Sequence, residues 1–130
     1  MGVWQWPNSR IHNVVDGDTV DSMLTKVVDI GFNGTTTITF PMRLRLSRVN
    51  TARVSSAKGR KAKELVLART ANTDVHITTL KPYKYGGPED KMAEYMAEVT
   101  LPDGANLSDL LVAEGLATYW DGNGPRPNDA

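Results

Sequence analysis

The chain has 130 residues, of which 40% are hydrophobic and 23% are charged, a composition typical of one soluble globular domain. It contains no cysteine, which excludes disulfide bonds, cysteine nucleophiles and zinc–thiolate sites. Neither a signal-peptide pattern nor an apolar run long enough to span a membrane is present, so we expect a cytoplasmic protein with no membrane partner.

The net charge is zero, but the charges are unevenly distributed along the chain. Residues 1–72 carry eleven Lys and Arg against five Asp and Glu, whereas residues 73–130 carry four against ten. Between Arg43 and Arg69, nine cations accompany the single anion Glu64. Such a local excess favours phosphates or an acidic partner, although a solvated helix face with scattered strand charges gives the same pattern.

The first half of the chain predicts an N-terminal arm followed by three strands. The arm and the strands are expected at residues 1–8, 10–15, 19–30 and 35–46. Asp16-Gly17-Asp18 predicts a turn between the first two strands, and Asn33-Gly34 is a strong hairpin signal before the third. Basic and apolar residues alternate at the end of the third strand, which places Arg43 and Arg45 on one face.

The second half predicts a loop, a long helix, two strands, a short helix and an extended end. These are expected at residues 50–56, 57–72, 74–80, 93–101, 108–113 and 116–120. Residues 121–130 are rich in Gly, Pro, Asn and Asp and predict a disordered tail. Five strands with this placement of helices are typical of an OB-type Greek-key barrel. We therefore predict a mainly β, α+β fold, with the barrel domain in residues 9–120.

Four short motifs occur in order along nearly the whole chain. They are V-D-G-D-T-V at residues 15–20, R-L-S-R-V-N-T-A-R at 45–53, G-R-K-A at 59–62, and D-G-A-N-L followed by L-V-A-E-G-L-A between 103 and 117. Together they resemble the staphylococcal nuclease (thermonuclease) family, whose second motif reads R-L-x-x-V-D-T-P-E. The resemblance implies an OB-type barrel and hydrolysis of DNA or RNA. Small proteins of this kind also occur in bacteriophages, so a phage-encoded protein acting in a host cytoplasm or a virion is one expectation.

The resemblance also assigns a metal site and a phosphate contact. In the family, two aspartates and a backbone carbonyl hold calcium, a glutamate handles the attacking water, and two arginines clamp the phosphate. Asp18 matches the first metal aspartate, with Asp16 as a nearby carboxylate, and Thr51 matches the carbonyl ligand. Arg45 matches the first arginine, and its planar fork suits a phosphate.

Three positions depart from the family pattern and suggest a degenerate active site. Asn50 replaces the second metal aspartate, so calcium binding is expected to be weakened. Arg53 replaces the catalytic glutamate, and losing a general base costs about 10²–10⁴ in rate. Glu94 replaces the second arginine, a group worth roughly 10³–10⁵. Because Arg53 and Glu94 exchange the family's charges, we also predict an ion pair between them.

These observations leave three functions open. The first is a nucleic-acid-binding or interaction module with little or no catalysis, and the second is a calcium-dependent phosphodiesterase. The third is a structural assembly protein, for example of a virion. Single-stranded DNA or RNA would bind the basic segment between Arg43 and Arg69, whereas a protein partner would use exposed aromatic residues as anchors. The candidate nucleic-acid contacts are Arg43, Arg48, Lys58, Arg60 and Lys61.

Overall fold

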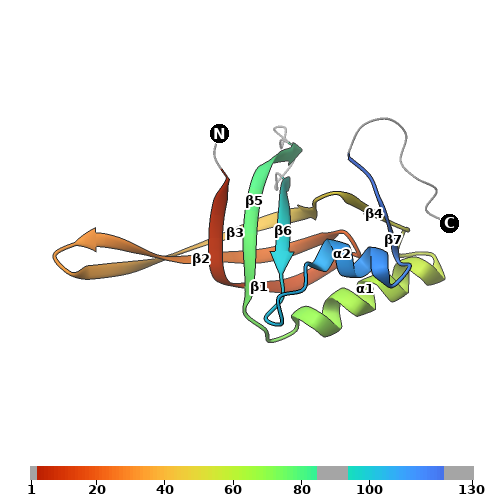
Figure 1. The fold of residues 1–130 in the computed structure, drawn as a ribbon, viewed down its shortest axis with the longest axis horizontal. Coiled ribbons are helices and arrows are strands. Elements are labelled where there is room, and N and C mark those ends of the chain that lie inside the picture. The colour runs from red at the N-terminus through yellow and green to blue at the C-terminus, as the bar shows by residue number, and fades with distance from the viewer. Residues whose placement is uncertain (1–2, 85–93, 122–130) are drawn as a thin grey trace.

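The computed structural model describes residues 3–84 and 94–121, which form a mainly β structure with two helices (Figure 1). Five strands close into a barrel in the spatial order β1–β2–β3–β6–β5. Their bounds are β1 Trp4–Asp16, β2 Thr19–Gly31, β3 Gly34–Leu46, β5 Val75–Lys84 and β6 Glu94–Thr100. The predicted α+β fold with a five-stranded barrel is therefore confirmed.

Antiparallel pairing joins neighbouring strands around the barrel, except that β3 and β6 run parallel where the barrel closes. Two short strands, β4 (Val49–Thr51) and β7 (Ala117–Tyr119), form a separate antiparallel pair. Helices α1 (Ala57–Thr70) and α2 (Leu107–Ala113) lie across the lower end of the barrel in Figure 1. Neither helix is long and apolar enough to cross a membrane, and the described ranges contain no other helix.

Branched aliphatic side chains fill the barrel because alternate strand residues point inward. Leu44 and Leu46 of β3 and Ile77 of β5 are fully buried, and Ala62 and Val66 of α1 cover the core from outside. Complete burial of each Leu or Ile side chain contributes about 1.5–3 kcal/mol. The intervening residues of β3 are thereby directed to the opposite face.

Helix α1 begins at a capped end that packs tightly against the rest of the fold. The side chain of Ser56 accepts a hydrogen bond of 3.0 Å from the backbone N–H of Gly59, which satisfies one free donor of the first turn. One turn later, Ala62 approaches the turn between β1 and β2 so closely that a Cβ on Gly17 would lie 2.7 Å from the Ala62 Cβ. This contact fixes the helix beside Asp16 and Asp18.

Strands β2 and β3 continue far beyond the barrel as a two-stranded arm, which projects to the left in Figure 1. Pairing of β2 with β1 ends at Met23, and pairing of β3 with β6 begins at Arg43. The arm turns at Phe32 and Asn33, which both have left-handed backbone angles, φ 58° and 59°. The predicted hairpin is thus confirmed, but its turn residues lie one position earlier than the predicted Asn33-Gly34.

Three elements differ from the sequence-based expectation, and one of them is β5, which extends to Lys84 instead of ending at Leu80. Strand β1 begins at Trp4, inside the predicted arm, because Trp4–Trp6 pair with residues 77–79 of β5. Strand β4 lies where a loop was expected and is held by pairing with β7. Most of the predicted tail, residues 122–130, lies outside the described residues.

Candidate active site and its basic border

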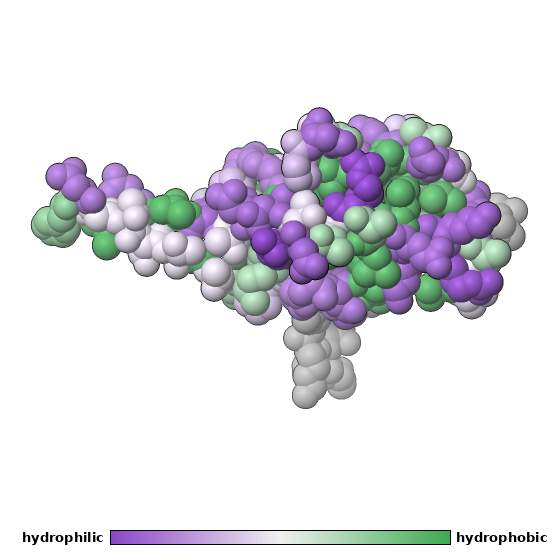
Figure 2. Space-filling model, turned by 90° about the horizontal axis from the view of Figure 1, so that it is seen from below, coloured by the Kyte–Doolittle hydropathy of each residue, from purple (hydrophilic) through white to green (hydrophobic). Residues whose placement is uncertain are grey.

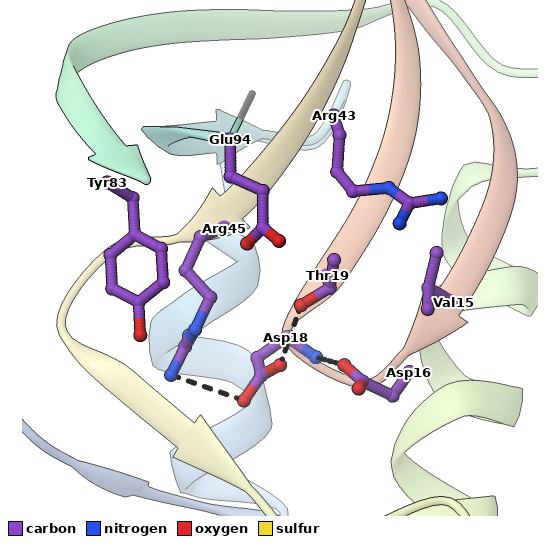
Figure 3. Close-up of a pocket in the computed structure, with 8 residues that line it drawn as sticks. All are labelled: Val15, Asp16, Asp18, Thr19, Arg43, Arg45, Tyr83 and Glu94. Atoms are coloured by element: carbon purple, nitrogen blue, oxygen red, sulfur yellow. Dashed lines mark hydrogen bonds and ion pairs between the residues drawn. The ribbon is translucent and has the colours of Figure 1, made fainter. Parts of the chain in front are cut away.

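Eight residues from β1, β2, β3, β5, β6 and the first turn line a polar pocket of about 510 Å³ (Figure 3). They are Val15, Asp16, Asp18, Thr19, Arg43, Arg45, Tyr83 and Glu94. The predicted phosphate contact, two predicted metal ligands and one substituted position therefore share a single pocket. Its charged groups are three carboxylates and two guanidinium groups.

Asp18 is buried and its carboxylate is fully engaged by protein donors. One oxygen accepts from the backbone N–H of Thr51 at 2.9 Å and lies 3.4 Å from the Arg45 guanidinium. The other accepts from the Thr19 hydroxyl at 3.1 Å. Burial would raise the pKa of Asp18, but a hydrogen bond with Asp16, the charge of Arg45 and the Thr51 N–H outweigh it and lower this pKa. Burial and the neighbouring Asp18 raise the pKa of Asp16 to about 6.

Arg45 is also buried, with 3% of its surface exposed, and it is tied to the protein on its inner side. Its Nη1 donates to the carbonyl oxygens of Leu46 at 2.9 Å and Val49 at 2.8 Å. Its Nη2 donates to the Asn50 amide oxygen at 3.3 Å and also faces Asp18. The guanidinium therefore connects β3 to β4 and the first turn, whatever it binds in the pocket.

The donor set makes a poor calcium site. The Asn50 side-chain oxygen and both Asp18 oxygens already accept protein hydrogen bonds. The described residues contain no group of three or more His, Cys, Asp or Glu side chains that could hold a metal ion. Thr51, whose backbone carbonyl is the predicted ligand, is buried, and its hydroxyl oxygen has no hydrogen-bond partner in the described part of the chain. Calcium prefers six to eight oxygen ligands, so these residues alone do not fit it.

Glu94 reaches the pocket through the parallel pairing of β6 with β3. Glu94 is in register with Arg43, so the two side chains share a face of the sheet. In Figure 3 the Glu94 carboxylate points into the pocket above Arg45. Arg43 turns to Asp21, with hydrogen bonds of 2.7 and 3.2 Å, and these bonds and the charges of Asp21 and Glu94 raise the pKa of Arg43.

The predicted ion pair between Arg53 and Glu94 is wrong for this structure. None of the ion pairs formed within residues 3–84 and 94–121 joins them. Arg53 is exposed and does not line the pocket, whereas Glu94 does. Strand alternation orients Glu94, but Arg53 lies in the loop after β4, where no such constraint acts.

The predicted nucleic-acid contacts fall into two groups. Arg43 and Arg48 are held by carboxylates, since Arg48 bonds Glu98 at 2.8 and 2.9 Å and Asp109 at 2.9 Å. In contrast, Lys58, Arg60 and Lys61 of α1 form no ion pair with the described residues. A nucleic acid would compete with carboxylates for the first group but not for the second.

Tyr83 is a pocket residue that sequence reasoning missed. Its ring centroid lies 5.5 Å from the Arg45 guanidinium carbon, in range for a cation–π contact. The sequence predicts that this strand ends at residue 80, so it gave no indication that Tyr83 would lie in β5 and reach the pocket. The segment Asp90–Ala93, which precedes Glu94, lies outside the described residues.

Comparison with protein families identifies the family of the chain. The family described as staphylococcal nuclease homologue matches residues 43–129, about two-thirds of the chain. The match contains Arg45, Asn50, Arg53 and Glu94 and begins after Asp18. A search of curated proteins found no match. The barrel, the pocket and the match agree, and the chain belongs to the staphylococcal nuclease family.

Proposed function

We propose that this chain binds nucleic acid through a basic surface beside the pocket and hydrolyses phosphodiesters little or not at all. The observation that carries the proposal is a run of cations that form no ion pair with the described carboxylates and are accompanied by a single anion, Glu64. This basic surface consists of Arg53, Lys58, Arg60, Lys61 and Lys63, and none of them forms an ion pair within the described chain. Unpaired cations bind phosphates by releasing condensed counterions.

The basic surface borders the pocket because of how α1 is docked. The first turns of α1 pack against the Asp16–Asp18 turn through Gly17 and Ala62. The N-terminal end of a helix also carries partial positive charge, which adds to the attraction for phosphate. Lys58 and Lys61 are three residues apart and share one side of this helix, which lies beside the pocket residues Asp16 and Asp18.

The pocket itself is a poor environment for the reaction. With Asp16, Asp18 and Glu94 ionised against Arg43 and Arg45, its formal charge is minus one. Glu94 places a negative charge where an incoming phosphate would need a positive one. Arg53 offers no general base, and the loss of a positioned base alone costs about 10²–10⁴ in rate. Binding without efficient turnover follows from these charges.

Fluorescence anisotropy with labelled single-stranded DNA and RNA tests the binding. The double variant Arg60→Gln/Lys61→Gln removes two charges from the basic surface. Its matched control, Arg10→Gln/Arg69→Gln, removes two charges that are paired with Asp74 and Asp103. We expect weaker binding only for the first variant. We also expect the slope of the logarithm of its binding constant against the logarithm of salt concentration to be smaller in magnitude by roughly one to two. Equal effects of both variants, or no binding by the native chain, would contradict the proposal.

A metal-dependent phosphodiesterase is the second candidate, favoured by one observation. Glu94 is a carboxylate in the pocket without a hydrogen bond to the described residues, and such a group can accept a proton. Cleavage assays with calcium, magnesium or manganese distinguish the candidates. Cleavage by the native chain that Asp18→Ala abolishes would establish the enzyme. Cleavage only by Asn50→Asp/Arg53→Glu/Glu94→Arg would support loss of catalysis, and neither binding nor cleavage would favour an assembly role.

A further inference from the structure

The arm formed by residues 25–40 is a surface that neither the pocket nor the basic surface uses. Beyond the barrel its two strands pair only with each other within the described chain. A two-stranded ribbon alone is marginally stable in water, and it gains stability when its apolar side is covered. Figure 2 shows the arm as a narrow projection on which hydrophobic and near-neutral residues outnumber hydrophilic ones.

One side of the arm carries large apolar side chains around a single charged residue, Lys26. Cross-strand partners share a side, so Phe40 lies with Leu24, Ile38 with Lys26, and Thr36 with Val28. Phe40 is 50% exposed and Ile38 42% exposed, which is high for such large apolar side chains. We call Val28, Ile38 and Phe40 the apolar face. The other side carries Thr35, Thr37 and Thr39 of β3 and one large apolar residue of β2, Val27, which is 59% exposed.

The two ends of the arm carry aromatic groups. At the tip, Phe32 is fully exposed. At the base, the Lys26 ammonium lies 4.8 Å from the ring centroid of Trp4 and 4.1 Å from that of Trp6, and Trp4 is 53% exposed. Lys26 at the base and Phe32 at the tip are separated by roughly 20 Å of extended strand, so the aromatic groups at the two ends do not meet within one chain.

We propose that the arm is a dimerisation element, in which the apolar face of one arm packs on the same face of a second copy. The two arms run antiparallel, so that Phe32 at each tip lies beside Trp4 at the other's base. A two-fold interface of this kind requires a patch that complements itself, and the arm supplies both halves. This inference goes beyond the nucleic-acid binding proposed above.

Charge and area both favour a second copy as the occupant. Residues 25–40 contain one cation, Lys26, and one anion, Asp29, which argues against nucleic acid and leaves no net repulsion between copies. In the antiparallel arrangement the two Lys26 residues lie roughly 20 Å apart, beyond the Debye length of about 8 Å. Covering Phe32 and the exposed parts of Trp4, Ile38 and Phe40 on two copies removes on the order of 1,000 Å² from water, the lower bound for a specific interface.

Sedimentation velocity of the full chain over a wide range of concentration tests the proposal. We expect a concentration-dependent dimer. The variant Ile38→Lys/Phe40→Lys should weaken self-association about tenfold or more, because it puts two charges on the apolar face. The matched control Thr37→Lys/Thr39→Lys adds the same charges to the opposite side of the same strand, and it should leave the dimer intact.

Three results would overturn the proposal. They are a native chain that stays monomeric at every concentration, a dimer that survives Ile38→Lys/Phe40→Lys, and equal loss of the dimer in both lysine variants. If the first variant does not fold, as judged by circular dichroism, a shortened arm replaces it, with Asn-Gly in place of residues 27–37. Since Lys26 and Ile38 are direct cross-strand partners, this two-residue loop closes the hairpin in register, and the shortened chain should be a folded monomer.

Discussion

Gly59 lies directly against the carbonyl group of Arg53. A Cβ atom on Gly59 would sit 1.8 Å from the Arg53 oxygen and 2.4 Å from its carbonyl carbon, and 2.8 Å from the oxygen of Ala52. No side-chain rotation relieves a clash with backbone. The start of α1 is therefore fixed to the loop that follows β4, which holds Arg53 beside the cations of α1.

Gly59→Ala should destabilise the protein although alanine is the better helix former. Alanine gains about 1 kcal/mol of helix propensity over glycine, but overpacking against immobile atoms costs about 1–3 kcal/mol or more. Because a 1.8 Å approach lies at the upper end of this cost, we expect a net loss of about 1–2 kcal/mol in the free energy of unfolding by urea. Arg60→Ala, at the exposed neighbour, should change it by less than about 0.5 kcal/mol. A stabilised Gly59→Ala protein would show that the loop moves freely away from α1.

The barrel could be predicted from sequence because its signals are local. Turn residues, alternation in β3 and the periodicity of α1 each specify their own element. The first residues of β1 could not be predicted in this way. Trp4 and Trp6 precede Pro7, and they form a strand only because they pair with Ile77 and its neighbours, some seventy residues away. Strand β4 has three residues, too few to show alternation, and it depends on β7 in the same way.

The site was predictable in composition but not in its contacts. The motifs singled out Asp18, Arg45 and Glu94, and these three residues line one pocket. They gave no information on the direction of Arg53, an exposed loop residue, so the ion pair inferred from its exchanged charge was wrong. They also gave no sign that Arg48 would be bound by Glu98, a residue fifty positions later. Contacts between distant segments depend on register, which a single sequence does not show.

Arg45→Met should strongly destabilise the fold. The guanidinium satisfies two buried carbonyl oxygens and faces Asp18, and removing one partner of a buried ion pair costs about 3–5 kcal/mol. The free energy of unfolding measures this loss, with the exposed Arg53→Met as the control expected to change little. If Arg45→Met is as stable as the native chain, then Arg45 is held for phosphate alone and its hydrogen bonds contribute nothing to folding.

The pKa shifts of Asp16 and Asp21 make the stability of the fold depend on pH in opposite directions. The pKa of Asp16 rises from 3.8 to about 6 on folding, so its stabilising contribution is complete below about pH 4 and is lost as the pH rises through 6. Asp16→Asn should therefore stabilise the fold at pH 7, by on the order of 1 kcal/mol given partial exposure, and not at pH 4. The Arg43 hydrogen bond lowers the pKa of Asp21, whose contribution is present above about pH 4 and lost below it.

Asp21→Asn is accordingly the matched comparison for Asp16→Asn. It should destabilise the fold at pH 7, and the loss should shrink as the pH falls below 4. Urea midpoints of both variants and the native chain at pH 7, 5 and 3.5 provide the test. Parallel changes of the two variants with pH would show that neither carboxylate has the environment described above.

The backbone angle of Arg48 predicts different stabilities for Arg48→Ala and Arg48→Gly. Its backbone has φ 70°, a left-handed angle that costs a non-glycine residue roughly 1 kcal/mol, and its guanidinium bonds Glu98 and Asp109. Arg48→Ala loses the ion pairs and keeps the strain, whereas Arg48→Gly loses the ion pairs and relieves it. Arg48→Gly should therefore be the more stable of the two by about 1 kcal/mol in urea unfolding. Because the carboxylates already bind this guanidinium, both variants should keep most of the native affinity for single-stranded DNA, and a large loss of binding would place Arg48 in the nucleic-acid interface.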